Sequence, residues 1–156
     1  MPTVHDSPNA WVAEHIRRFE ETGGRPRPGV NDLLLTTRGR KSGELRRTAL
    51  VYERDGDRYV LAASNRGSDH HPAWYLNLLA DPYVTVQVGT ETFTACARPA
   101  TAEERPHLWR LMVSAMSEYA TYQQRITRQI PVVLLRRVED LNGDALGDHS
   151  ADCGET

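Results

Sequence analysis

The chain has 156 residues, of which 39% are hydrophobic and 26% charged, the range of a globular protein with one core. Its formal net charge of −2 argues against a long polyanion such as nucleic acid as partner. The N-terminus is too charged for a signal peptide and no run approaches the ~20 apolar residues of a membrane span, so we expect a cytoplasmic protein.

The first predicted element is a helix within residues 1–23. Ser7 can cap it, Pro8 suits its first turn, and the glycines at 23–24 end it. Its apolar face recurs at helical spacing and consists of Trp11, His15, Ile16 and Phe19. We expect this face to pack on the domain. Covering of a ligand by this face and contact of the helix with a membrane surface stay open as alternatives.

Strand-like runs begin after residue 31. They cover residues 32–38, 47–54, 58–64, 84–88, 92–99 and 131–139. Asp55–Gly56 and Gly89 stand between neighbouring runs and predict hairpins. Strands joined by such short turns must be antiparallel, because parallel neighbours need long crossovers.

Two further helices are predicted later in the chain. A short one begins at Pro72 and ends before Pro82, and a long one covers residues 101–129. Thr101 and Glu104 fit a capping box at the start of the long helix. The acidic segment 139–156 is predicted to be disordered.

These elements predict a mainly β, α+β fold. We expect one domain over residues 1–138, with the barrel and its helices in residues 31–138. About six antiparallel strands would form a closed or partly closed β-barrel, flanked by an N-terminal helix, a short middle helix and one long late helix. Alternating βαβ units are absent from the predicted pattern, which argues against a Rossmann domain.

The stretch TTRGRKSGELRRTAL is the most basic part of the chain. Glu44 alone opposes five cations, which are Arg38, Arg40, Lys41, Arg46 and Arg47. A strand–turn–strand arrangement would gather Arg and Lys donors, the Ser42 hydroxyl and the N–H groups of Gly39 and Gly43 around one phosphate or carboxylate. A solvated charged hairpin is the alternative. Nucleic-acid binding is disfavoured, because no aromatic residues alternate with these cations.

The stretch LAASNRGSDHHPAWYLNL is a second candidate. Ala62 and Ala63 are small enough for a flat ring to approach the backbone, and Ser64 and Asn65 follow with hydrogen-bonding groups. The helix that starts at Pro72 would point its first N–H groups at the same place. Trp74 could wall off a ring or simply belong to the core.

Other chemistries in this stretch are disfavoured. The adjacent His70 and His71 point apart and lack a third ligand, so no metal site is expected. A hydrolase triad of Ser64, His71 and Asp69 would lack the usual nucleophile elbow.

Tyr119 and Tyr122 form the third candidate. Their spacing of three places both on one helical face, where they could stack on a planar substrate and donate a hydrogen bond to its oxygen. Aromatic residues at this spacing also arise from core packing alone.

Together these stretches resemble the deazaflavin-dependent nitroreductase family. The resemblance covers Leu33 to Leu135 and includes the segments GRKSG, YVLAASNRG, HPAWYLNL and YATYQQR in the family's order. It implies a split β-barrel related to FMN-binding proteins. It also implies that the chain binds the 8-hydroxy-5-deazaflavin coenzyme F420, whose tail ends in phosphate and glutamates.

The resemblance also implies roles for individual residues. The coenzyme tail would be held by Arg40, Lys41, Ser42, Gly43 and Arg46. The deazaflavin ring would be lined by Ala62, Ala63, Ser64, Asn65, Ala73, Trp74 and Asn77. Tyr119 and Tyr122 match aromatic positions that face the substrate, whereas Met116 and Arg125 stand where some relatives have aromatic residues.

The function that this resemblance implies is an oxidoreductase. The reduced deazaflavin would pass a hydride to a planar electrophile such as a quinone, a nitroaromatic or an enone, with Ser64, Tyr119 or Tyr122 as candidate proton or hydrogen-bond donors. Alternatives are an FMN-dependent oxidoreductase on the same fold, a non-catalytic deazaflavin-binding protein and a general anion-binding barrel. The sequence leaves monomer and homodimer open.

Overall fold

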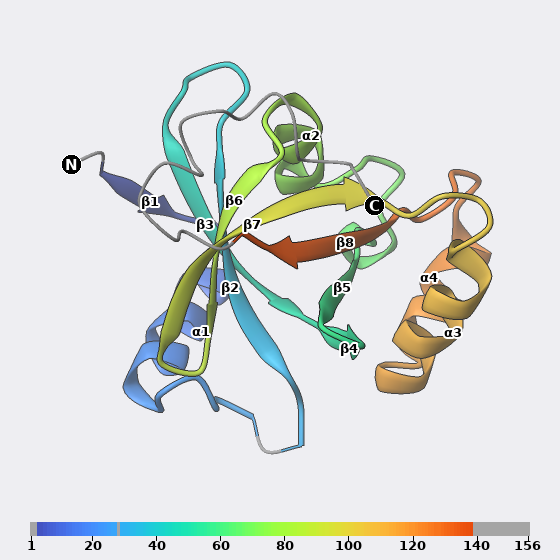
Figure 1. Cartoon of the computed structure of the whole chain (residues 1–156), viewed down its shortest axis with the longest axis horizontal. Coiled ribbons are helices and arrows are strands. Elements are labelled where there is room, and N and C mark those ends of the chain that lie inside the picture. Colours follow the sequence, from blue (N-terminus) through green and yellow to red (C-terminus); the bar gives the residue numbers. More distant parts are fainter. Residues whose placement is uncertain (1–2, 28, 139–156) are drawn as a thin grey trace.

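The computed structural model describes residues 3–27 and 29–138, so the predicted tail at 139–156 lies outside the described residues. The strands are β1 (Val4–Asp6), β2 (Asp32–Arg38), β3 (Leu45–Val51), β4 (Glu53–Asp55), β5 (Arg58–Ala62), β6 (Tyr83–Val88), β7 (Glu91–Pro99) and β8 (Val132–Arg137). The helices are α1 (Ala10–Glu21), α2 (Ala73–Ala80), α3 (Arg105–Ala115) and α4 (Glu118–Arg125), with a short 3₁₀ turn, η1, at Asn65–Gly67. Figure 1 shows α1 at one side of the sheet and α3 and α4 together at the other.

One mixed sheet contains all eight strands of the described residues, in the order β1-β3-β2-β6-β7-β8-β5-β4. Only the β1–β3 pairing is parallel within this part of the chain, and the predicted hairpins β4–β5 and β6–β7 are confirmed. The prediction of about six strands was too low, and the sheet does not close into a barrel within the described residues, because its end strands β1 and β4 do not pair with each other. The run at 47–54 divides because β3 pairs with β2 whereas β4 pairs with β5, and between them the Tyr52 N–H donates to the carbonyl of Asn31.

The alternation of side chains along the strands divides the core into three clusters. Leu33 and Leu35 face the interior of the sheet, while Leu34 between them packs against Ile16 and Phe19 of α1. A third cluster packs α3 and α4 against β5 and β8, and it includes Val60, Leu108, Met112, Tyr119, Ile130 and Leu134. Helix α1 therefore covers the sheet at β2, and α3 and α4 cover it at β5 and β8.

Two helix predictions need correction. Asn9, not Ser7, caps α1, because its Oδ1 accepts the N–H groups of Trp11 and Val12 at 2.9 and 3.2 Å. The predicted long late helix is two helices, since Met116 has an extended backbone (φ −150°, ψ 103°) that ends α3 before α4 begins. The capping box before α3 is confirmed, with Thr101 and Glu104 exchanging hydrogen bonds.

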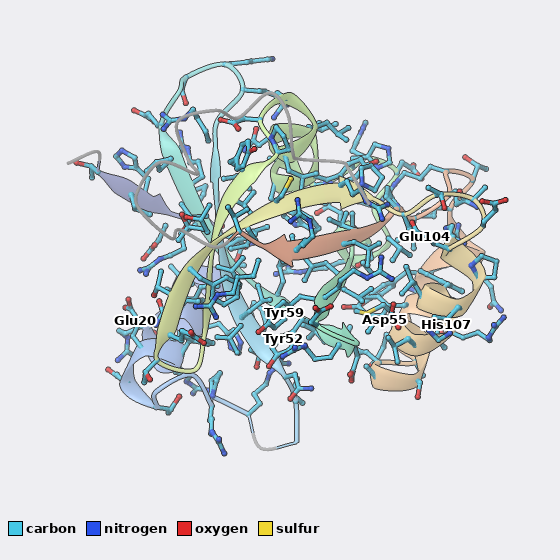
Figure 2. All side chains as sticks on the ribbon, in the orientation of Figure 1. Glu20, Tyr52, Asp55, Tyr59, Glu104 and His107 are labelled. Atoms are coloured by element: carbon cyan, nitrogen blue, oxygen red, sulfur yellow. The ribbon has the colours of Figure 1, made fainter. Side chains whose placement is uncertain are left out.

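Ion pairs attach α3 to the sheet (Figure 2). Glu104 receives a two-pronged interaction from Arg98 of β7 at 2.8 and 3.0 Å, and the Nε2 of His107 lies 3.2 Å from Asp55 of β4. The Arg98 hydrogen bonds are the main reason that the pKa of Glu104 lies well below its usual range.

Within residues 3–27 and 29–138, none of the helices has the length and apolar character that crossing a membrane requires.

Candidate active site

A cavity of about 850 Å³ lies between β3 and the end of β5. Its wall follows β3 from Arg46 to Val51 and continues on the loop after β5, the start of α2 and part of α4. The predicted site residues that line it are Arg40, Lys41, Ser42, Arg46, Ala62, Ser64, Asn65, Ala73, Trp74, Asn77, Tyr119 and Tyr122. Gly43 and Ala63 lie outside the lining, Gly43 in the β2–β3 turn and Ala63 buried in the core.

The basic turn between β2 and β3 keeps its charge mainly at its tip. Three of its five cations have carboxylate partners: Arg38 with Asp81 at 3.8 Å, Arg46 with Glu44 at 3.1 Å, and Arg47 with Asp6 at 2.7 Å and Glu20 at 3.0 Å. Among the described residues, Arg40 and Lys41 have no such partner. Two uncompensated cations at the cavity wall can therefore serve an anionic ligand.

Asn77 of α2 fixes the position of this turn. Its Oδ1 accepts hydrogen bonds from the backbone N–H and the Nη1 of Arg40, at 3.2 and 3.0 Å, and its Nδ2 donates to the hydroxyl of Thr37 at 3.1 Å. The side chain is 4% exposed. Its amide atoms are thus occupied by the protein, and Asn77 contributes to the site by positioning Arg40.

The loop that contains Ser64 has an unusual backbone. Asn65 and Arg66 have φ values of 49° and 57°, a left-handed conformation that is unfavourable for residues other than glycine. The guanidinium of Arg128 holds this loop by donating to the carbonyls of Ala63, Ser64 and Ser68 at 3.3, 2.8 and 3.0 Å.

His71 completes this arrangement. Its Nδ1 accepts a hydrogen bond from Nη1 of Arg128 at 3.0 Å, which requires the ring to be neutral. Burial, followed by the charge of Arg128, lowers the pKa of His71 and favours that state. His71 therefore supports the loop and does not line the cavity.

Tyr119 and Tyr122 meet edge to face, with ring centroids 6.4 Å apart. Tyr119 is 5% exposed and belongs to the core cluster under α3 and α4, yet it also lines the cavity. Burial raises the pKa of Tyr119 well above its usual value, so its phenol stays protonated and can donate a hydrogen bond. Tyr119 is therefore a core residue that also lines the cavity, and its contact with a ligand stays a prediction.

One part of the cavity wall combines the helix face for which the sequence left ligand contact open with residues that sequence reasoning missed. It is formed by the face of α1 and the start of β2, through Trp11, Val12, His15, Arg27 and Asp32. The Nε2 of His15 lies 3.5 Å from Oδ1 of Asp32, and Nη2 of Arg27 donates to the same oxygen at 2.7 Å. The predicted helical face contained Trp11 and His15, but no local signal connects residues 15, 27 and 32.

The described residues contain no group of three or more His, Cys, Asp or Glu side chains that could hold a metal ion. The cavity instead combines cations without a carboxylate partner among the described residues, including Arg40 and Lys41, with small residues at Ala62 and Ala73, the indole of Trp74 and two tyrosines. Such a set fits a flat organic ligand with an anionic extension.

The chain is similar in sequence to known proteins. Residues 11–137 match the family model described as F420H(2)-dependent quinone reductase. An F420H(2)-dependent quinone reductase of Mycobacterium tuberculosis strain H37Rv is 41% identical over 108 residues, which cover 67% of this chain and 72% of that protein.

Two solved structures are also similar. One described as an F420-H2 dependent reductase has a TM-score of 0.63 and 39% identity, covering 68% of this chain and 94% of that one. Another, described as a domain-swapped dimer, has a TM-score of 0.65 and 38% identity, covering 83% of this chain and all of that one. The chain therefore belongs to the F420H(2)-dependent quinone reductase family, whose members are oxidoreductase enzymes.

Proposed function

We propose that this chain reduces quinones with coenzyme F420H2 as the hydride donor. One observation carries the proposal: a single cavity is lined by the free cations Arg40 and Lys41, the small-residue wall at Ala62 and Ala73, and Tyr119. Packing of a hydrophobic core does not by itself require cations, small residues and a tyrosine to line the same cavity. Nitroaromatics and enones are planar electrophiles that the same site could accept.

The residues present fit a deazaflavin with an acidic tail. Arg40 and Lys41 would bind the phosphate and glutamate groups, with Arg46 and the Ser42 hydroxyl beside them. The ring would lie against Ala62 and Ala73 and beside Trp74. When bound, the reduced coenzyme supplies a hydride from its C5 position. The family's F420H2 dependence favours this cofactor over FMN.

The protein's own residues would orient the acceptor and exclude water from it. The Tyr119 phenol, kept protonated by burial, would donate a hydrogen bond to the acceptor oxygen as negative charge develops there. Ser64 is 8% exposed and lines the cavity, so its hydroxyl is a second candidate donor, and Tyr122 would pack against the acceptor ring.

The experiment is to mix the purified protein with F420H2 and menadione and to follow the absorbance of the deazaflavin. We expect oxidation of the coenzyme well above the rate without protein. Parallel titrations with F420 and with FMN should show preference for F420. Tight coenzyme binding without turnover of any quinone would instead identify a non-catalytic coenzyme carrier, and binding that any polyanion abolishes would identify a general anion-binding barrel.

A further inference from the structure

His15 has the geometry of an acid–base group at the cavity wall. It is 7% exposed, and its Nε2 is fully enclosed, without a hydrogen bond among the described residues, 3.5 Å from the carboxylate of Asp32. Nδ1 has no hydrogen bond to the described residues either, and unlike Nε2 it is not fully enclosed. Because His15 lines the cavity, Nδ1 is the nitrogen that can meet a ligand there.

The pair of His15 and Asp32 lies at the end of the cavity where we expect the acceptor, away from the site of the coenzyme tail. Asp32 is paired with Val51 at one end of the β2–β3 ladder, and Arg38 is paired with Leu45 at the other end, next to the basic turn. Six residue steps along a strand separate these ends by about 20 Å. A coenzyme whose acidic tail binds at the basic turn therefore leaves the end of the cavity near His15 for the acceptor.

Tyr119 connects this end of the cavity to α4. Tyr119, Arg27 and Asp32 all line this cavity, and the charges of Arg27 and Asp32 contribute to the pKa of the Tyr119 phenol. Since burial raises the pKa of Tyr119, the phenol holds its proton and is a poor acid. Reduction of a quinone to a neutral hydroquinone nevertheless requires a proton.

We propose that His15, oriented by Asp32, is the catalytic acid that protonates the reduced acceptor. This inference rests on the proposed function. His15 is the one histidine that the described residues contribute to the cavity wall. An imidazole with a carboxylate beside one nitrogen and with the other nitrogen open is a common arrangement for proton transfer.

The step is balanced as follows. The quinone gains two electrons and one hydrogen as a hydride from F420H2 and becomes a hydroquinone monoanion. The Nδ1–H bond of the His15 imidazolium breaks, an O–H bond forms on the acceptor, and neutral hydroquinone results. Solvent then returns a proton to the imidazole. The charged groups that face His15 are Asp32 of β2 and, through the shared Oδ1, Arg27 of the α1–β2 connection.

The test uses the substitution His15→Gln. It places an amide near the position of Nε2, so it can keep the contact with Asp32 but cannot donate from the Nδ1 position. Thermal unfolding and fluorescence titration with F420 report on fold and coenzyme binding without any turnover, and both should be close to wild type for His15→Gln.

Two acceptors then separate proton transfer from hydride transfer. Menadione needs a hydride and a proton, whereas the cation methylene blue takes a hydride alone and gives a neutral product. For His15→Gln we expect kcat with menadione to fall about 100-fold, the low end of general acid catalysis, and the rate with methylene blue to stay within a few-fold of wild type. The menadione reaction of the wild type should also show a solvent isotope effect that His15→Gln alters.

Equal losses with both acceptors, or unchanged menadione turnover in His15→Gln, would overturn the proposal and leave His15 as a packing residue between α1 and β2. Absence of coenzyme oxidation by the wild-type protein with either acceptor would instead contradict the proposed function itself.

Discussion

The side chain of Asn77 accepts two hydrogen bonds from Arg40, one from the backbone N–H and one from the guanidinium. A neutral amide thus holds the tip of the basic turn against α2 without cancelling its charge. Figure 1 shows the β2–β3 turn and α2 at the same end of the molecule.

Replacing this amide by a carboxylate should weaken coenzyme binding. Asn77→Asp keeps the acceptor for Arg40 but gives the guanidinium a counter-ion, so less of its charge remains for the coenzyme tail. We expect the Kd for F420 to rise about 10-fold, the loss of roughly one charged hydrogen bond. Fluorescence titration measures it, and an unchanged Kd would show that Arg40 does not contact the tail.

The double substitution Arg40→Ala with Lys41→Ala should weaken F420 binding more, by about 10- to 100-fold, because both uncompensated cations are lost. Both side chains are exposed, so the thermal midpoint should change little. Arg25→Ala with Arg110→Ala is the control matched in charge, since both residues are exposed cations outside the cavity lining. Equal effects of the two changes would point to net charge alone.

Tyr119→Phe should act on the acceptor and not on the coenzyme. The change removes one hydrogen-bond donor and retains the buried ring, so kcat with menadione should fall about 10- to 100-fold at an unchanged Kd for F420. Stopped-flow measurement of coenzyme oxidation would separate this effect from product release. A wild-type rate would return Tyr119 to a purely structural role.

Gly67 allows the approach of Tyr122. A Cβ added there would lie 3.1 Å from Cδ1 of the tyrosine, and the residue has φ of +79°. Gly56 has a similar φ of +65° but open space around it, so Gly56→Ala is a control for backbone strain alone. Both changes should cost about 1 kcal/mol of stability, but only Gly67→Ala should raise KM for menadione, because it displaces Tyr122. Equal KM values would show that Tyr122 is remote from the acceptor.

The loop that carries Ser64 should loosen in mild acid. The pKa of His71 is lowered in the folded chain, so below about pH 6.5, the ordinary histidine value, the unfolded chain binds more protons than the folded chain. The free energy of unfolding therefore falls as the pH falls below about 6.5, and it is retained above that pH. His71→Asn offers Arg128 an amide oxygen near the Nδ1 position and does not titrate. Urea unfolding between pH 7.5 and 5 should therefore show a smaller loss for the variant than for wild type. Parallel curves would mean that the His71–Arg128 contact does not control this loss.

The sequence predicted well what depends on neighbours along the chain. The hairpins at Asp55–Gly56 and Gly89 follow from local turn chemistry, and both glycines have positive φ. The break at Met116 could not be seen, because the three- and four-residue spacing of apolar side chains continues through it. The short strand β1 gives almost no sequence signal and exists because β3 offers it an edge.

The same distinction applies to the site. The basic turn and the Ser64 loop are each continuous in sequence, so both could be selected as candidate segments, and both line the cavity. The cluster of His15, Arg27 and Asp32 depends on how α1 packs against β2 through Ile16 and Leu34, which only the folded chain determines.

Arg47 has a practical consequence for anyone who prepares this protein. Its guanidinium joins Asp6 of β1 and Glu20 of α1 at the wall of the cavity, so two acidic groups mask one cation. Proteolytic clipping after residue 6 would remove Asp6 and leave Glu20 to neutralise Arg47. A clipped sample would then carry one acidic group fewer at the cavity wall, and mass spectrometry should precede any affinity measurement.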